Sequence, residues 1–488
     1  MQLSQRSFPG IWLAAALLAG CSTQTAYQRP VLDVPAQFKQ ATPAAAEAGI
    51  WRQADPAQAA EGVPERWWEL FGDEQLNRLQ AQAAAGNQSI AQAAARLRAA
   101  QAAVASSQAS LFPTLGSTAS ATRSRSGGAS GASGSSGSLS TGYALGLNTS
   151  WELDLWGRVA GTVSASQASA QASASDLAAA RLSAQATVTQ TYFSLRASET
   201  QARLLQETLQ SYEQSLQLTR NRYRAGVASA ADVAQAEAQY KSTQAQLIES
   251  QASRAQLEHA LAALLGLPPA AFSLEAVGEL PQPPEVPAML ASSLLLQRPD
   301  IAAAERRVAA ANAQVGVARA AFFPALTLSA SAGYRGASLS DLASAPNLFW
   351  SLGPSLALSL FDGGARSAAV ESARASLDLA AATYRQTVLT ALQEVEDNLA
   401  VAAALAREQQ VQAEAVAAAS KALEVVSNQY RAGTVAYLNV LSAQTTVLSA
   451  RRSLIDVRNR RLAAVNTLLK NVAGRWQPAP QSSAQAAR

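Results

Sequence analysis

Two stretches of the sequence, NRYRAGVASAADVAQAEAQ at 221–239 and NQYRAGTVAYLNVLSAQTT at 428–446, are versions of one phrase. The shared residues include Tyr223, Arg224 and Gly226 in the first copy and Tyr430, Arg431 and Gly433 in the second. A glycine here ends a helix because it adopts a left-handed backbone without steric cost, and Ser229 is placed to cap the next helix. The sequence therefore predicts a duplicated helical hairpin, with this phrase as the bend of each copy.

Long helices are predicted on both sides of each bend. The chain has no proline over 159–223 or 366–430, and apolar side chains recur every seven residues, as at Val233, Tyr240 and Leu247. Heptad spacing of this extent is typical of coiled coils, with helices wrapped on a globular core as the alternative. The first helix would be roughly 95 Å long at 1.5 Å per residue, which no single-domain core requires.

Four short segments alternate between apolar and small or polar residues, which predicts strands. They lie near 113–123, 143–155, 324–334 and 349–361. Each has about the length that a tilted strand needs to cross a bilayer. Four strands cannot close a membrane barrel, since the smallest use about eight. The strands are therefore either shared between chains or part of a soluble sandwich with one buried face.

Each half of the chain is thus expected to contain a helix, two strands, a long helix, a bend and a return helix. The bends are expected at about 224–230 and 431–437, and the strands and bends at opposite ends of the helices. The predicted organisation is a signal peptide (1–20), an N-terminal segment (21–65), a first repeat (66–280), a Pro-rich crossing (266–299), a second repeat (299–473) and a tail (474–488).

The N-terminus has the layout of a secretory signal. Arg6 is followed by the apolar run IWLAAALLAG and then by Cys21, the only cysteine of the chain. The sequence LAGC resembles the bacterial lipobox, in which the cysteine is lipidated and becomes the mature N-terminus; an ordinary signal peptide is the alternative. No later apolar run is long enough for a transmembrane helix.

Several function classes are disfavoured by composition. The net charge of +4 and the absence of a Lys/Arg-rich block argue against nucleic acid as a partner. His259 is the only histidine, so one chain cannot assemble a histidine-based metal site or catalytic triad. We expect no enzyme activity, no metal and no cofactor.

Several motifs occur in an informative order: RWWELFGDEQLNRLQAQAAAGNQSI from Arg66, SWELDLWGRV from Ser150, QRPDIAAAERRVAAANAQVGVARAAFFP from Gln297 and the two YRAG bends. Together with the lipobox they resemble the outer membrane factor (TolC-like) family, in particular its NodT-type efflux lipoproteins. The resemblance implies a mainly α fold with membrane β: long coiled-coil hairpins forming a periplasmic α-barrel, and four strands per chain contributing to a shared trimeric β-barrel. It also implies a lipid-anchored protein of the bacterial outer membrane.

The resemblance implies a constriction of the tunnel just after the second bend, at Leu438, Asn439, Ser442 and Thr445. Relatives often carry an aspartate at the position of Ser442 with charged neighbours; this chain lacks those charges, and Leu438 would supply an apolar ring instead. After the first bend, Asp232 is either part of an anionic ring of three copies or a second helix cap beside Ser229. The two YRAG bends are the candidate docking positions for an adaptor.

The predicted function is a passive trimeric exit duct of a tripartite efflux pump, carrying toxic small molecules from the periplasm to the exterior. The expected partners are two further copies, a periplasmic adaptor protein, an inner-membrane pump and outer-membrane lipid. Two alternatives remain: the outer-membrane channel of a type I protein secretion system, and a structural coiled-coil lipoprotein without a pore.

Overall fold

The computed structural model describes residues 27–30, 38–39, 51–52, 66–125, 139–277, 279–284, 286–287 and 298–472. The predicted signal peptide and Cys21, most of the segment 21–65, much of the Pro-rich crossing and the tail 474–488 lie outside these ranges. None of the helices within them combines the length and the apolar character needed to cross a bilayer.

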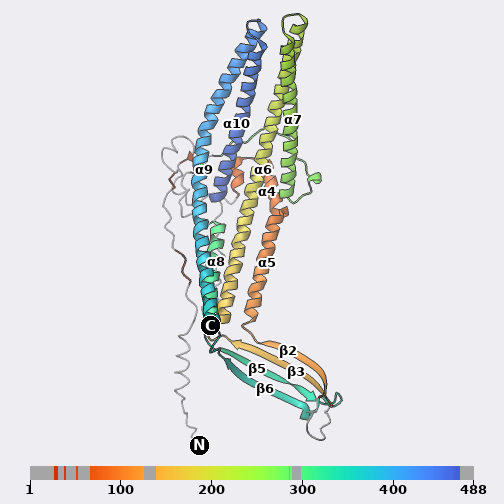
Figure 1. Ribbon diagram of the computed structural model, residues 1–488, viewed down its shortest axis with the longest axis vertical. Coiled ribbons are helices and arrows are strands. Elements are labelled where there is room, and N and C mark those ends of the chain that lie inside the picture. Colours follow the sequence, from red (N-terminus) through yellow and green to blue (C-terminus); the bar gives the residue numbers. More distant parts are fainter. Residues whose placement is uncertain are drawn as a thin grey trace. The chain divides into compact units, whose positions relative to one another are not determined.

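The chain is mainly helical with one four-stranded sheet, which confirms the predicted fold class (Figure 1). The helices are α4 (Glu74–Gly86), α5 (Gln88–Ala109), α6 (Arg158–Arg224), α7 (Ala230–Leu264), α8 (Pro299–Ala320), α9 (Ala365–Arg431) and α10 (Tyr437–Val472). The strands are β1 (Trp51–Arg52), β2 (Thr114–Arg125), β3 (Leu139–Leu153), β4 (Val286–Pro287), β5 (Ala325–Gly336) and β6 (Leu348–Ala357). Short 3-10 turns are η1 (Trp67–Phe71), η2 (Pro269–Ala271) and η4 (Ala345–Asn347).

The chain divides into two compact units that do not coincide with the two sequence repeats. Unit 1 comprises Met1–Val31, Leu97–Ser173 and Ala304–Tyr384, and unit 2 comprises Leu32–Arg96, Ala174–Ala303 and Arg385–Arg488. Each unit takes residues from both repeats because α6 and α9, each 67 residues long, contribute to both.

The sheet of unit 1 is antiparallel, with the strand order β2-β3-β5-β6. Its register places Leu147 opposite Ala332 and Ala332 opposite Trp350. One residue further along, Asn148, Ser331 and Ser351 share the other face. Since neighbouring residues of a strand point to opposite faces, the sheet has one apolar face and one face of small polar residues. This is the alternation that the sequence predicts.

A close approach of β3 and β5 depends on a glycine. Gly333 lies opposite Gly146, and a Cβ atom added at Gly333 would come within 2.3 Å of the Leu145 carbonyl oxygen and 2.5 Å of the Gly146 Cα. No side chain fits at that distance, so the two backbones meet only because this position has no Cβ.

An aspartate caps the start of each long helix that follows a pair of strands. The carboxylate of Asp154 accepts hydrogen bonds from the backbone N–H groups of Val159 and Ala160, at 3.0 and 2.6 Å. In the second repeat Asp362 accepts from the N–H groups of Gly364 and Arg366, at 3.0 and 3.2 Å. These bonds satisfy helix donors that have no partner within the helix.

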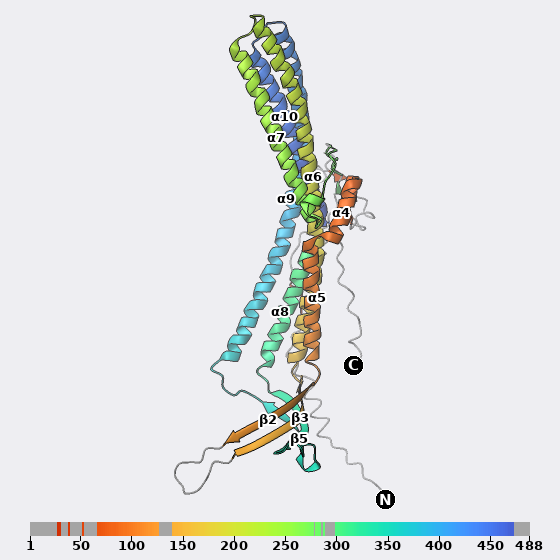
Figure 2. The ribbon, with the colours of Figure 1, turned by 90° about the vertical axis from the view of Figure 1, so that its right-hand side faces the viewer.

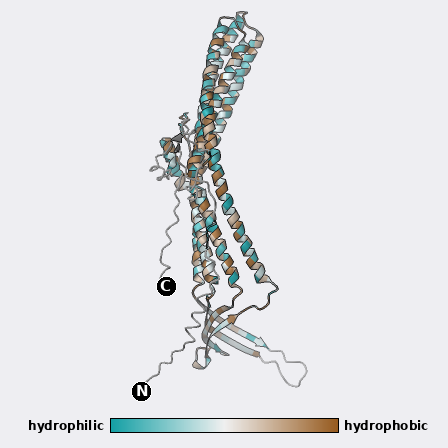
Figure 3. Cartoon of the chain, turned by 90° about the vertical axis from the view of Figure 1, so that its left-hand side faces the viewer, coloured by the Kyte–Doolittle hydropathy of each residue, from teal (hydrophilic) through white to brown (hydrophobic). Residues whose placement is uncertain are grey.

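Unit 2 contains two helical hairpins, formed by α6 with α7 and by α9 with α10 (Figure 1). Hydrophobic and hydrophilic residues are interspersed along these helices (Figure 3). The heptad residues Val233, Tyr240 and Leu247 of α7 are half-buried and pack against buried clusters of the bundle. Fully buried residues of these helices include Leu205, Tyr212 and Leu216 of α6, Ala236 and Thr243 of α7, and Leu448, Leu462 and Leu469 of α10. The apolar stripes therefore face neighbouring helices, while the polar faces remain exposed to solvent.

The short helix α4 lies beside α6 in unit 2 (Figure 2). Asp73 caps α4 by accepting from the Leu76 N–H, and its other carboxylate oxygen accepts from the Tyr192 hydroxyl at 2.6 Å. Gln80 donates to the Gln185 carbonyl oxygen at 2.8 Å. These contacts attach α4, near the start of the first repeat, to α6.

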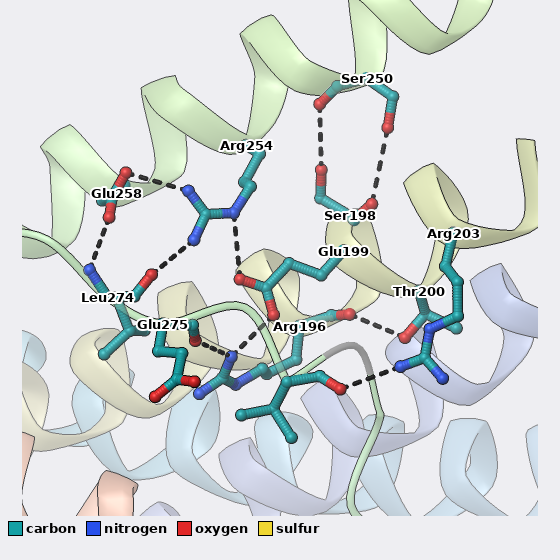
Figure 4. A network of polar contacts seen from close by, with 11 residues as sticks. Arg196, Ser198, Glu199, Thr200, Arg203, Ser250, Arg254, Glu258, Leu274 and Glu275 are labelled. Carbon is teal, nitrogen blue, oxygen red and sulfur yellow. Dashed lines mark hydrogen bonds and ion pairs between the residues drawn. The ribbon is translucent and has the colours of Figure 1, made fainter. Parts of the chain in front are cut away.

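A charged network fixes the chain where it leaves α7 (Figure 4). Buried Arg196 and Glu199 of α6 form an ion pair at 2.7 Å, and Arg254 of α7 contacts the same carboxylate at 3.1 Å. Arg196 donates to the carbonyl oxygen of Glu275 at 2.9 Å, and Arg254 donates to that of Leu274 at 2.6 Å. The connecting segment is therefore held against both helices by charge-assisted hydrogen bonds.

We expect Gly333→Ala to destabilise the folded sheet by about 1–3 kcal/mol, because the new methyl group overlaps the backbone of β3. The measurement is the temperature at which the folded, fast-migrating form is lost on a gel. Gly353→Ala is the matched control, since a Cβ at Gly353 meets nothing within 4 Å. Equal stability of the two variants would contradict the close packing of β3 and β5.

Candidate functional site

The apolar face of the sheet is exposed in the isolated chain. The exposed fraction is 74% for Leu115, 76% for Trp350 and 65% for Leu352, and Leu145 and Leu147 of β3 are also exposed. Soluble monomers rarely expose a continuous apolar surface of this kind, which marks contact with a membrane or another protein. The opposite, polar face needs no such partner.

The first bend forms as its glycine predicts. Gly226 has φ of +75°, its N–H donates to the Tyr223 carbonyl oxygen at 2.9 Å, and the Val227 N–H donates to that of Arg222 at 2.9 Å. This pair of bonds is the Schellman motif that ends a helix. Ser229 then caps α7, as the sequence predicts.

The second bend repeats this geometry with different surroundings. Gly433 has φ of +82°, and the Thr434 N–H donates to the Gln429 carbonyl oxygen at 3.0 Å. Tyr430 is buried and packs against Tyr437 with ring centroids 5.6 Å apart, in a cluster with Leu216, Ala236 and Val440. Its counterpart in the first bend, Tyr223, is 50% exposed. The tyrosine of the shared motif is therefore a core residue in the second bend and a surface residue in the first.

Arg222 joins the two hairpins at the bends, which sequence analysis missed. Its guanidinium donates to the carbonyl oxygens of Tyr430 and Arg431, at 3.0 and 3.4 Å, and lies 4.7 Å from the centroid of the Tyr430 ring. A cation at the last carbonyls of α9 also suits the helix dipole. The one available signal was that the first phrase has Arg222 where the second has Gln429.

The four residues predicted to line the aperture are Leu438, Asn439, Ser442 and Thr445, and all four are exposed on α10. Leu438, Ser442 and Thr445 follow the spacing of one helix face. Their neighbours Tyr437, Val440 and Gln444 are buried and face the bundle. The candidate aperture face is thus exposed in the isolated chain, and the side-chain hydrogen bonds of Thr445 stay within α10.

Asp232 takes part in a capping box at the start of α7. Its carboxylate accepts from the backbone N–H and the hydroxyl of Ser229, both at 2.9 Å, while its own N–H donates to the Ser229 hydroxyl at 3.1 Å. The cap predicted from the sequence is therefore present. Both bonds from Ser229 go to one carboxylate oxygen, Oδ2, so the cap does not exclude a ring role.

Among the docking candidates, the two arginines that follow the tyrosines are exposed. Arg224 donates to the side-chain oxygen of Asn221 at 2.5 Å, within its own helix. Arg431 is exposed at the second bend. Both arginines are thus exposed at the bends, whereas Tyr430 is buried. Cys21, the predicted lipidation site, lies outside the described residues.

The comparison with protein families agrees with these features. The model of the family described as "Outer membrane efflux protein" matches residues 79–267 and 290–474. The chain belongs to this family of outer-membrane channels, which is a family of transport proteins rather than of enzymes. The predicted resemblance to outer membrane factors is confirmed.

Individual relatives cover nearly the whole chain. The probable efflux pump outer membrane protein TtgC of Pseudomonas putida is 33% identical over 473 residues, which cover 96% of both chains. The cation efflux system protein CusC of Escherichia coli is 30% identical over 473 residues, covering 95% of this chain and 97% of the relative. The solved outer-membrane channel OprN superimposes with a TM-score of 0.84 at 30% identity, covering 93% of this chain and 99% of OprN. This protein is accordingly an outer-membrane channel of the efflux type.

Replacing Asp232 separates the ring role from the cap role. In Asp232→Asn the amide oxygen still accepts from Ser229, but the charge is lost; in Ser229→Ala the cap is weakened and the charge stays. If Asp232 lines the pathway, we expect Asp232→Asn alone to shift the reversal potential in a KCl gradient toward the non-selective value. Unchanged cation preference in Asp232→Asn would leave Asp232 as a cap only.

Proposed function

We propose that three copies of this chain assemble into one exit duct, in which their sheets close a common barrel and their hairpins line a tunnel. The observation that carries the proposal is the open four-stranded sheet with an exposed apolar face. Within the described residues, β2 and β6 each have a strand on one side only. In the hydrocarbon layer every backbone N–H and C=O group needs a partner, so these two edges require strands from other copies.

The helical hairpins would form the periplasmic part of the duct. Their residues are mostly small and polar on the exposed faces, which suits a wall with helical neighbours on two sides and water on another. The exposed face of Leu438, Ser442 and Thr445 would line the narrow part of the tunnel. Arg224 and Arg431, exposed at the bends, would meet a periplasmic adaptor protein that links the duct to an inner-membrane pump.

Transport through the duct would be passive. The described residues contain no cluster that would hold a metal ion, and the sequence has no nucleotide-binding motif. The energy would then come from the inner-membrane pump. The relatives are named for antibiotic, toluene, cation and pyoverdine efflux or export, and we propose toxic small molecules as the cargo here.

A lipid on Cys21 would anchor the N-terminus in the outer membrane beside the barrel. The position of the only cysteine after an apolar run supports this proposal. A single acyl chain binds membranes weakly, so stable attachment takes more than one.

The assembly state tests the duct directly. We expect the full-length protein in detergent to have three times the mass of the chain by light scattering, and to conduct poorly in planar bilayers until the bends are loosened. Loss of the gene should raise sensitivity to several unrelated toxic compounds. A monomer in detergent, with unchanged tolerance in the deletion strain, would refute the proposal.

Lipidation has its own test. We expect labelled palmitate to be incorporated into the wild type and not into Cys21→Ala. The conductance of purified Cys21→Ala should equal that of the wild type, because the sheet, not the lipid, forms the pore. Incorporation of labelled palmitate into Cys21→Ala would show that another residue carries the lipid. A conductance of Cys21→Ala that differs from the wild type would show that the lipid contributes to the pore.

A further inference from the structure

A cavity of about 300 Å³ lies among α6, α7 and α10 in unit 2. Each helix contributes residues at the same i, i+4, i+7 spacing, and these residues are Ser194, Ser198 and Gln201 of α6, Gln246, Ser250 and Ser253 of α7, and Arg452, Asp456 and Asn459 of α10. Positions with this spacing form one helix face. Three polar helix faces therefore converge on one space.

The hollow has a clear cause in the sequence. Serines on α6 and α7 are too small to fill the space between helices, and Ser198 and Ser250 pair across it through hydroxyl–carbonyl bonds of 3.4 and 3.5 Å (Figure 4). The adjoining layer of the same helices is apolar and packed, with buried Leu204, Leu205 and Leu448. The polar cavity is thus a local departure from a packed coiled coil.

Arg452, itself exposed, lines this cavity and forms no ion pair with a carboxylate among the residues that the structure describes. Its Nη1 donates to the Gln246 side-chain oxygen at 2.9 Å. With the Gln201 amide turned so that its oxygen faces the guanidinium, that oxygen accepts from Nε at 3.0 Å and from Nη2 at 2.9 Å. These neutral amides use three of the five guanidinium N–H donors and leave two. Such donors bind carboxylate or phosphate oxygens well.

Two carboxylates also line the cavity, one on α10 and one on α7. Asp456, one turn after Arg452, forms its ion pair with Arg460 at 3.0 Å rather than with Arg452. Glu249 of α7 is exposed at the cavity, and no ion pair or hydrogen bond occupies it within the described residues. The cavity therefore offers a cation and a carboxylate from different helices.

We propose that this cavity binds a small polar zwitterion, whose anionic group contacts Arg452 and whose ammonium group contacts Glu249. The size is at the lower end of ligand pockets, and the serine and glutamine groups suit a hydrogen-bonding molecule more than an apolar one. The site goes beyond the channel role: it is a binding site on the helices, and the ligand would join α10 to α6 and α7.

A dipeptide with free ends is a suitable probe because its carboxylate and ammonium can be removed separately. We would titrate alanyl-glutamine, its N-acetyl form and its C-terminal amide into the full-length protein in detergent by calorimetry. We expect saturable binding of the free dipeptide, weakened about tenfold or more in each blocked form, since each loses one charge-assisted hydrogen bond.

Three variants complete the test. Arg452→Gln removes the cation. Ser253→Phe places a large side chain at the cavity while Arg452 itself is unchanged. Arg451→Gln is the matched control, because Arg451 does not line the cavity. We expect binding to be lost in the first two and kept in the third, with unchanged melting temperature and conductance in all three. Normal conductance in the same preparation shows that the duct itself is intact.

The proposal is overturned if the free dipeptide does not bind, if its blocked forms bind equally well, or if Ser253→Phe binds like the wild type. The cavity would then be a hydrated polar layer of the coiled coil. If the wild type binds the dipeptide but does not form trimers or conduct, the proposed duct is refuted and the proposed binding site is retained.

Discussion

Backbone hydrogen bonding at the two edges of the sheet is the constraint on which this molecule depends. Strands β2 and β6 each present a row of N–H and C=O groups, and the sheet between them exposes Leu115, Trp350 and Leu352 on one face. Water can satisfy the edges but not the apolar face, and a membrane can accept the apolar face but not the edges. Pairing with strands of further copies, as proposed for the duct, would satisfy both requirements at once.

The duplicated hairpin shows how one sequence motif acquires two environments. Both glycines adopt the left-handed backbone, and both helices end through the same hydrogen bonds. Tyr430, however, is enclosed by residues of both hairpins, whereas Tyr223 faces outward. Arg222 adds a contact of the first hairpin to the second that has no reciprocal, since Gln429 occupies the equivalent position. The repeat is symmetric in its backbone and asymmetric in its contacts.

Local signals explain why much of the fold could be predicted from the sequence. Proline-free heptads, alternating segments and the glycines of the bends each depend on residues close together in the chain, and the helices and strands lie within a few residues of the expected bounds. The Ser229 cap was likewise visible in the sequence.

Contacts over long sequence separations could not be predicted in the same way. No spacing rule connects Arg196 with the carbonyl group of Glu275, or Arg222 with the ring of Tyr430. The two possible roles of Asp232 could not be separated, because a capping carboxylate and a tunnel carboxylate require the same residue at the same place. The residues of the candidate aperture came from family resemblance, and the structure adds that they share an exposed face of α10.

The charged network at the exit of α7 distinguishes the two halves of the repeat. Counterparts in the two hairpins differ by 207 residues (428 − 221), an offset that also relates the starts of α6 and α9. By this offset, Arg196, Glu199 and Glu258 correspond to Ala403, Ala406 and Val465. Arg461, the counterpart of Arg254, has its pKa lowered by burial and donates to Gln409 instead of to a carboxylate. Within the part of the chain that the structure describes, this network therefore occurs only in the first hairpin, where it holds the segment that leaves α7 toward the second repeat. The two copies share a backbone plan but not this means of anchoring the exit segment.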